Sequence, residues 1–470
     1  MALVCLGLAA GCGAAKRKPK NVLLITIDTL RADRIGAYGD PSTRTPSIDE
    51  LARRGTLFES AHSPIPLTLP SHTSMMTGNY PRTHLVLSHA YTLAPERITL
   101  AEILKEHGYS TAAFVSSHVL DKSYGLDQGF ETYWERWHLL SDVTESLTAS
   151  GFELTAKAAR LWIKDRPAEK PFFAWVHLFQ PHKPYTPPAP LARLYDPGYE
   201  GSIVADVPTL VGIWEEKRAL APEDLRHIQA LYQGEVTTAD REVGRIVDLL
   251  EREGIMKDTI VIVTSDHGEM LYEQDCYFGH DIMLYEPAIA VPLVFFGDGV
   301  FPEGAIARQN ARLIDLAPTI LESVGLSHEF LGAIDGLSLL PPVWREGQGA
   351  ERRWGPKQLS GAKGAPASDT LFAEIFPPKP GWKVEPRHAL RTPGWKLIME
   401  DGVEARELYS LDPDPRERAN LALAEPDMTA RLFTAWDAWR ASKQRDFKTT
   451  FPDLDAETVE NLKSLGYIDN

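Results

Sequence analysis

The chain has 470 residues, more than one ordinary hydrophobic core holds, which indicates a large domain joined to a smaller one. Its composition, 43% hydrophobic and 24% charged, is that of a soluble globular protein. The formal net charge of −16 argues against nucleic acid or an anionic membrane surface as a partner, because both are polyanions. An anionic substrate would therefore require a locally positive site. The three cysteines are too few for a structural disulfide framework.

The first residues form an apolar run that ends at Cys12. The residues just before it, Leu8 to Gly11, resemble the lipobox of bacterial lipoproteins, in which the cysteine becomes lipidated. We therefore expect residues 1–20 to be a signal and spacer. The protein would be exported to the bacterial periplasm or cell envelope, with the lipid on Cys12 as its only membrane attachment. Against this, no basic residue precedes the run and the basic cluster 16–20 follows it, so a wrongly assigned start or an uncleaved apolar tail stays open. The run is shorter than the ~20 apolar residues that span a bilayer.

Continuous apolar runs rich in β-branched residues predict buried parallel strands. Two of these runs, 21–28 and 259–266, end in an aspartate, and similar runs lie at 110–116, 172–177 and 292–296. The segment 240–253, by contrast, has apolar residues at helical spacing. Strands that alternate with helices predict an α/β fold, in which residues at the carboxyl ends of the strands line the ligand crevice. Asp28 and Asp266 occupy such positions.

The pattern changes after residue 297. A short helix is expected at 315–325, and the segment 347–368, rich in glycine, proline and charge, predicts an exposed loop. Beyond that loop we expect strands and an amphipathic helix, at 387–398, 406–409 and 429–443. The sequence therefore predicts a catalytic domain at 21–346 and a small C-terminal α+β unit at 369–470, whose terminal helix packs on the main domain.

The stretch 64–78 predicts a helix with a polar residue at its start. Pro70 suits the first turn of a helix and Gly78 its C-terminal end. Thr68 then lies at the helix N-terminus, where free N–H groups and the helix dipole favour an anion or a developing alkoxide. The alternative is that Thr68 is only an N-cap, a role that threonine often fills.

A second polar stretch, 264–269, follows the other strand that ends in an aspartate. Asp266 and His267 offer one oxygen and one imidazole nitrogen, a pair that suits Zn²⁺ or Mn²⁺ better than Ca²⁺. Alone, Asp-His-Gly could equally be a hydrogen-bonded turn. In combination with Asp28 and Thr68, it indicates a metal-dependent catalytic site.

Taken in order, these stretches resemble the sulfatase family of the alkaline phosphatase superfamily. In that family the first strand ends in an Asp-Asp pair before Leu-Arg, and the nucleophile lies in C-x-P-S-R, followed by a helix and T-G-x-Y-P. The matching stretches here are 28–31, 68–72, 77–81, 180–185, 265–268, 279–280, 284–286, 407–413 and 420–422. Several motifs in the expected order carry a lower risk of a chance match than one motif. The resemblance implies an alkaline-phosphatase-like sandwich, a large, mostly parallel sheet flanked by helices, and hydrolysis of anionic esters.

Three departures from the family pattern bear on the chemistry. Thr68 stands where sulfatases have the Cys or Ser that is oxidised to formylglycine, and threonine cannot become that aldehyde. A phosphorylated threonine can be cleared by attack on phosphorus, so phosphorus is the expected reaction centre. Thr29 replaces the second Asp of the pair, and His72 replaces the motif arginine.

The resemblance implies a metal shell made of Asp28, Asp266, His267 and the Thr68 oxygen. We expect one divalent ion in it, with Zn²⁺ or Mn²⁺ favoured and Ca²⁺ allowed, because the extra Asp-x-x-x-His of two-zinc relatives is absent from the sequence. Such an ion would lower the pKa of the Thr68 hydroxyl and polarise the ester.

Several further side chains are candidates for catalysis or substrate binding. His84, His182 and His280 match family positions that surround the anion, and with His72 they are candidates for proton transfer. For each histidine the alternative is a solvated or packing role. Arg31, His182 and His280 are the candidates for substrate binding, and Arg31 could instead pair with a surface carboxylate.

The leading hypothesis is a hydrolase of phosphate mono- or diesters, or phosphonate esters, that forms a covalent intermediate on Thr68. Its substrate would be a small-molecule ester or one derived from a glycan or lipid. The first alternative is a sulfuric ester hydrolase that works without formylglycine. The second is a catalytically silent, metal-holding protein that binds sulfated or phosphorylated glycans. The presence of every proposed metal ligand favours a hydrolase.

Overall fold

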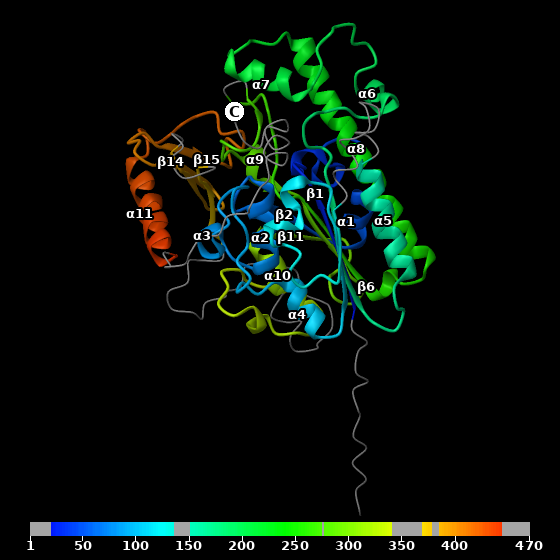
Figure 1. Cartoon of the computed structure of the whole chain (residues 1–470). Helices are drawn as coiled ribbons and strands as arrows, with labels where there is room; N and C mark the ends of the chain where they lie inside the picture. The colour runs from blue at the N-terminus through cyan, green and yellow to red at the C-terminus, as the bar shows by residue number, and fades with distance from the viewer. Residues whose placement is uncertain (1–19, 136–150, 275–276, 341–368, 378–384, 444–470) are drawn as a thin grey trace, which may run out of the picture.

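The computed structural model describes residues 20–135, 151–274, 277–340, 369–377 and 385–443 (Figure 1). Its main domain contains one large sheet with strand order β11-β2-β10-β6-β1-β5-β3-β4, and β9 pairs with β2. All neighbours along this order are parallel except those of β10, and β9 is also antiparallel to its neighbour. The strands are β1 Asn21–Ile27, β2 Thr56–His62, β3 Ser110–Phe114, β4 Thr132–Trp134, β5 Phe172–Leu178, β6 Thr259–Thr264, β9 Ala290–Val291, β10 Leu293–Phe296 and β11 Ala305–Arg312.

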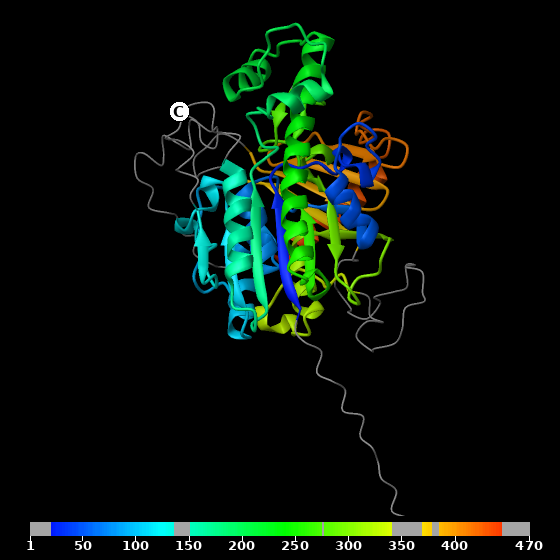
Figure 2. The ribbon, with the colours of Figure 1, turned by 90° about the vertical axis from the view of Figure 1, so that its right-hand side faces the viewer.

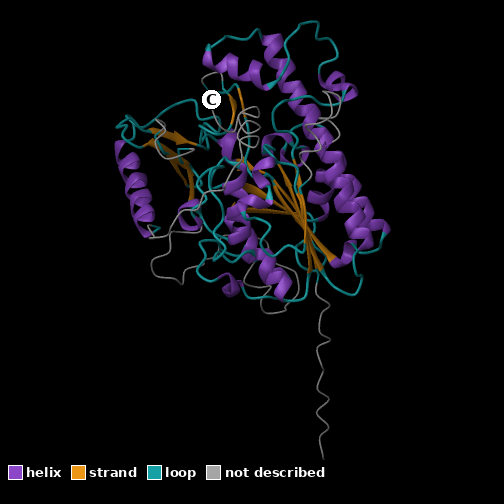
Figure 3. Ribbon diagram, viewed as in Figure 1, coloured by secondary structure: helices purple, strands orange, loops and turns teal. Residues whose placement is uncertain are grey.

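Helices cover both faces of this sheet, as Figures 2 and 3 show. Strand β1 contributes to both cores because successive side chains point to opposite faces. Leu23 and Ile25 pack with α1 Pro46–Arg54, α5 Gly151–Asp165 and α8 Pro222–Arg252. Val22 and Leu24 belong to the opposite core, with α2 Thr68–Thr77, α4 Leu100–Glu106 and α10 Leu316–Ser323. The expected α/β sandwich, with a large, mostly parallel sheet, is therefore confirmed.

Shorter elements surround the carboxyl edge of the sheet. They are α3 Pro81–His84, α6 Ala189–Tyr195, α7 Val207–Glu215, α9 Glu286–Ile289 and the two-stranded sheet β7 Met270–Leu271 with β8 Phe278–Gly279. In Figure 1, α6, α7 and the start of α8 project above the rest of the domain. Among the described helices, none combines the length and apolar character needed to cross a membrane.

A separate antiparallel sheet lies near the C-terminus, as expected. Its strands are β12 Leu371–Ile375, β13 Arg387–Arg391, β14 Trp395–Glu400 and β15 Glu407–Ser410, and α11 Pro426–Ser442 packs on β13 and β14. Phe372 and Trp439 stack at 4.1 Å between ring centroids, and Trp439 also packs against Tyr80 of the main domain at 5.1 Å, so α11 contacts both the small sheet and the main domain. Buried Lys396 joins the unit to the main domain through Glu286, 3.0 Å away. The predicted loop 347–368 and Cys12 lie outside the described residues.

Candidate active site

Two parallel strands bring the predicted acidic residues to one edge of the sheet. β1 and β6 are direct neighbours, with Thr26 opposite Thr264, so the residues that follow both strands emerge side by side. Ligand atoms of Asp28, Asp266 and His267 all lie within 4.8 Å of one another, and all three side chains are fully buried. Residues more than two hundred positions apart therefore form one compact cluster.

Thr68 reaches the same cluster from the N-terminus of α2. Its hydroxyl oxygen lies 3.3 Å from His267 Nε2. The N-cap residue is Leu67, whose side chain makes no capping bond, so Thr68 is the first helical residue and not the N-cap. The Ser71 hydroxyl donates to the Asp266 carbonyl oxygen at 2.7 Å, which ties the first turn of α2 to the strand end. Gly78 ends the helix with φ +69°, as the sequence predicted.

The cluster has the donor set and the unsatisfied oxygens expected for a cation site. In the described part of the chain, both carboxylate oxygens of Asp28 and Oδ2 of Asp266 lack a well-aligned hydrogen-bond donor although they are buried. Burial and the charge of Asp266 raise the pKa of Asp28 well above its usual value. Burial acts in the same direction on Asp266, but the neighbouring His267 and His72 hold its pKa at about 2. Two carboxylates, an imidazole and a hydroxyl therefore fit Zn²⁺ or Mn²⁺.

His72 connects the first turn of α2 to strand β1. Trp175 Nε1 donates to the Thr26 hydroxyl at 2.9 Å, and that hydroxyl lies 3.0 Å from His72 Nε2. His72 Nδ1 can then donate to the Thr68 carbonyl oxygen at 2.7 Å. Burial is the main reason that the pKa of His72 falls to about 3, which agrees with a neutral ring in this chain of bonds. One ring nitrogen therefore holds the Thr68 carbonyl group, and the other bonds to Thr26 of β1.

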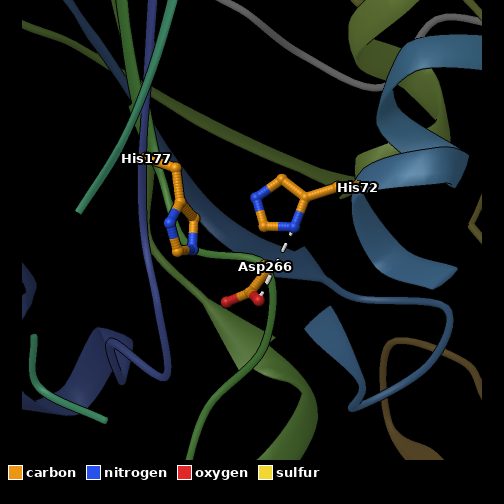
Figure 4. A group of neighbouring side chains, drawn as sticks. All are labelled: His72, His177 and Asp266. Carbon is orange, nitrogen blue, oxygen red and sulfur yellow. Dashed lines mark ion pairs between the residues drawn. The ribbon is translucent and has the colours of Figure 1, made fainter. Parts of the chain in front are cut away.

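His177, at the end of β5, braces the cluster from the other side of β1. Figure 4 shows His72, His177 and Asp266 converging from three different elements. The Ser116 N–H and hydroxyl lie 3.5 and 3.2 Å from His177 Nδ1, which leaves Nε2 to face Asp28 Oδ2 at 3.3 Å. Sequence reasoning missed His177, although it follows a predicted strand in the same way as Asp28 and Asp266.

A second group of side chains lies next to His267. The rings of His267 and His280 are 4.2 Å apart, and those of His280 and His182 are 5.3 Å apart. Glu269, which sequence reasoning also missed, lies 3.0 Å from His280 Nδ1 and accepts a bond from the Tyr185 hydroxyl at 2.9 Å. Burial is the main cause that lowers the pKa of His182 and of His280 well below the usual value. The structure thus brings two of the predicted substrate-binding residues to the cluster.

Arg31 and His84 are occupied elsewhere. Arg31 forms two bonds with Asp33 at 2.7 and 2.8 Å, and its remaining nitrogen bonds to Glu273 and to the Glu269 carbonyl oxygen. It is therefore the partner of carboxylates, the alternative that the sequence left open. The two ring nitrogens of His84 bond to the Ser74 hydroxyl at 2.9 Å and to the Val86 N–H at 3.1 Å. These bonds use four of the five N–H groups of Arg31 and both ring nitrogens of His84.

Two more buried histidines, His89 and His118, lie close to this site. The charges of His267, Asp281 and Asp266 all act on His89, and His118 in turn acts on His89. Burial is the main reason that the pKa of His89 falls to about 3. Their sequence neighbourhoods carry no strand-end or helix-start signal, so the chain pattern alone did not reveal them.

An acidic cluster at the carboxyl edge of a parallel sheet, next to a hydroxyl at a helix N-terminus, defines a metal-dependent hydrolase of α/β type. Comparison with known proteins specifies the family. The Sulfatase family model matches residues 20–326. The chain belongs to the sulfatase family, whose members hydrolyse anionic esters with the help of a divalent metal ion.

Individual relatives are distant but match over most of their length. Arylsulfatase K of Gallus gallus is 25% identical over 90% of this chain and 84% of its own. The phosphonate monoester hydrolase of Agrobacterium radiobacter superposes with a TM-score of 0.72 at 21% identity, over 90% of this chain and 96% of its own. A protein solved with its substrate D-glucosamine-2-N,6-O-disulfate gives a TM-score of 0.71 at 18% identity, over 91% and 98%. These structural similarities establish the fold.

Proposed function

We propose that this protein hydrolyses phosphate or phosphonate esters through a covalent intermediate on Thr68. The observation that carries the proposal is the Thr68 hydroxyl, which lies 3.3 Å from His267 at the first residue of α2. The first-turn N–H groups and the helix dipole stabilise negative charge that develops on this oxygen. A divalent ion held by Asp28, Asp266, His267 and the hydroxyl would lower the pKa of that hydroxyl and polarise the ester.

The proposed reaction has two displacements at phosphorus. The Thr68 oxygen attacks phosphorus as its hydroxyl proton passes to the unprotonated ring nitrogen of His280; the bond to the leaving oxygen breaks, and the leaving group takes up that proton from His280. Water then attacks phosphorus, and Thr68 regains its hydroxyl as phosphate or phosphonate departs. His280 is the proposed partner for the proton, because Glu269 fixes one ring nitrogen and the other is left for the substrate. His182 forms part of the wall on the same side.

Sulfate ester hydrolysis is the second candidate, favoured by the relatives whose names describe sulfatases. Threonine makes it the weaker one. A sulfated Thr68 has no geminal hydroxyl whose collapse would release sulfate, so water would have to attack sulfur. The silent-binder alternative is disfavoured because every proposed ligand is in place around a competent hydroxyl.

A panel of p-nitrophenyl esters tests the proposal. Sulfate, phosphate, bis-phosphate and phenylphosphonate esters are each assayed with chelated protein to which Zn²⁺, Mn²⁺ or Ca²⁺ is returned. Phosphorus esters are expected to turn over faster than the sulfate ester, and chelated protein to be inactive. Preference for sulfate, or activity unchanged by the chelator, would contradict the proposal.

For the location we propose export with a lipid on Cys12, in line with the apolar run before it.

A further inference from the structure

The 180–185 turn carries a buried lysine that the proposed reaction does not use. Lys183 is 8% exposed, and its positive charge opposes the effect of burial on the pKa of two carboxylates, Glu269 and Asp281. Glu269 is bonded to Tyr185 and His280, and Asp281 to Tyr277, so the N–H groups of the ammonium stay available for an anion. The long, flexible stem of lysine makes it suitable as a point charge for an anion.

One bond within the turn holds its shape beside Lys183, and a second bond ties the turn to the site. His182 Nδ1 donates to the Lys183 carbonyl oxygen at 2.7 Å, and the Tyr185 hydroxyl donates to Glu269 at 2.9 Å. The ammonium group itself lies against the turn that carries His280: a methyl group built on Gly279 would come within 3.1 Å of Lys183 Nζ. Glycine at that position therefore makes room for the Tyr277 hydroxyl, 2.6 Å from the same methyl position, as well as for the lysine beside His280.

The charges around the site leave Lys183 as its fixed positive group. Arg31 is bound to Asp33 and Glu273, and His72 is neutral in its chain of bonds. The negative groups are Asp28 and Asp266, together with Glu269 and Asp281, whose pKa values burial raises and the charge of Lys183 lowers. A divalent ion offsets the first pair and Lys183 offsets one charge of the second, so without Lys183 the wall beside a dianionic ester would be more negative by one charge.

We infer that the Lys183 ammonium group binds a second negative charge on the substrate, and so selects dianionic esters over monoanionic ones. The inference rests on the proposed function, because it assumes an anionic ester beside Thr68 and His280. The geometry that carries it is the placement of Lys183 Nζ against Gly279, next to the predicted substrate-binding histidines. A charge-assisted bond of this kind strengthens binding by about 10- to 100-fold.

The test measures equilibrium binding of two probes to the Zn²⁺-loaded protein by titration calorimetry at about pH 8. Inorganic phosphate is then mainly a dianion, whereas bis(p-nitrophenyl) phosphate is a monoanion. Lys183→Gln is expected to weaken phosphate binding about 10- to 100-fold and diester binding less than about threefold. Lys183→Arg should keep most of the preference, because it keeps the charge. Lys105→Gln, on the exposed face of α4, makes the same change in net charge and should leave both affinities unaltered.

Each outcome decides the inference. Unchanged phosphate affinity in Lys183→Gln overturns it, as does an equal loss for both probes, or a parent protein that does not bind phosphate. Thermal unfolding of each variant shows whether a loss reflects misfolding, and Lys183→Arg then repeats the comparison in a protein that retains the charge. Binding is separate from turnover: loss of phosphate affinity without hydrolysis of any panel ester would support Lys183 and refute the proposed function.

Discussion

Replacing Thr68 by alanine separates its chemical role from its structural role. Thr68 is fully buried and its hydroxyl has His267 as a neighbour at 3.3 Å, so the loss of a methyl group and one weak bond costs about 1–2 kcal/mol of unfolding free energy. A domain of ordinary stability tolerates that loss. Removal of a covalent nucleophile typically lowers kcat by several powers of ten, and a factor of about 1000 corresponds to about 4 kcal/mol of transition-state stabilisation.

Initial rates on the best phosphorus ester give the comparison, with thermal unfolding as the check on folding. Thr68→Ser is the matched control, because it keeps the hydroxyl at the start of α2, and we expect it to retain activity within about tenfold of the parent. Mass spectrometry of the parent protein quenched during turnover should reveal a phosphate adduct on Thr68. An alanine variant with the turnover of the parent would refute the reasoning and assign the attack to water.

Three further predictions concern stability and location. Lys396→Met should lower the free energy of unfolding in urea by about 3–5 kcal/mol, because it removes the cation 2.8 Å from the buried Glu417 carboxylate, whereas Glu286 keeps Arg391 at 3.2 Å; an equally stable variant would show that Glu417 does not depend on the lysine charge. Burial lowers the pKa of His84 to about 3, below the ~6.5 of an unfolded chain. Its contribution to stability is therefore complete above pH ~6.5 and is lost progressively as the pH falls from ~6.5 toward about 3. At about pH 5 the loss is about 2 kcal/mol, and thermal midpoints of His84→Gln should fall less with acid than those of the parent; parallel curves would contradict this. Cys12→Ser should abolish incorporation of a labelled fatty acid, and label retained by the variant would rule out the lipid anchor.

The main sheet could be predicted because its strands are buried on both faces. Residues such as those of β1 are apolar without interruption, and in a soluble chain a short run of this kind is typical of a strand covered by helices on both sides. The helix α8 was predicted only over its second half, from residue 240. Its first half buries Gly234, Glu235 and Thr237, and a methyl group on Gly234 would lie 2.7 Å from Pro187. Tertiary packing dictates those residues, so helical periodicity does not show them.

The strand-end rule located Asp28 and Asp266 because parallel neighbours in register must deliver their next residues to the same edge. It could have located His177 as well, since β5 is the other neighbour of β1. Helix chemistry located Thr68 for a similar reason: proline and glycine set the ends of α2 regardless of what surrounds it. These inferences depend on backbone geometry, which the sequence encodes locally.

The partners of the basic side chains, by contrast, could not be predicted from the sequence. Arg31 stands beside a strand end and has the right charge for an anion, yet Asp33, two residues later, binds it through both oxygens. Lys183 lies in a turn with no such signal, and only the fold places it against Gly279 and near Glu269 and Asp281. A basic side chain can bind a carboxylate of the protein or an anion of the substrate. The choice depends on whether a carboxylate lies within bonding distance of it in the folded chain. In this protein, whose net charge repels anionic esters at long range, that distinction determines where the substrate can be bound.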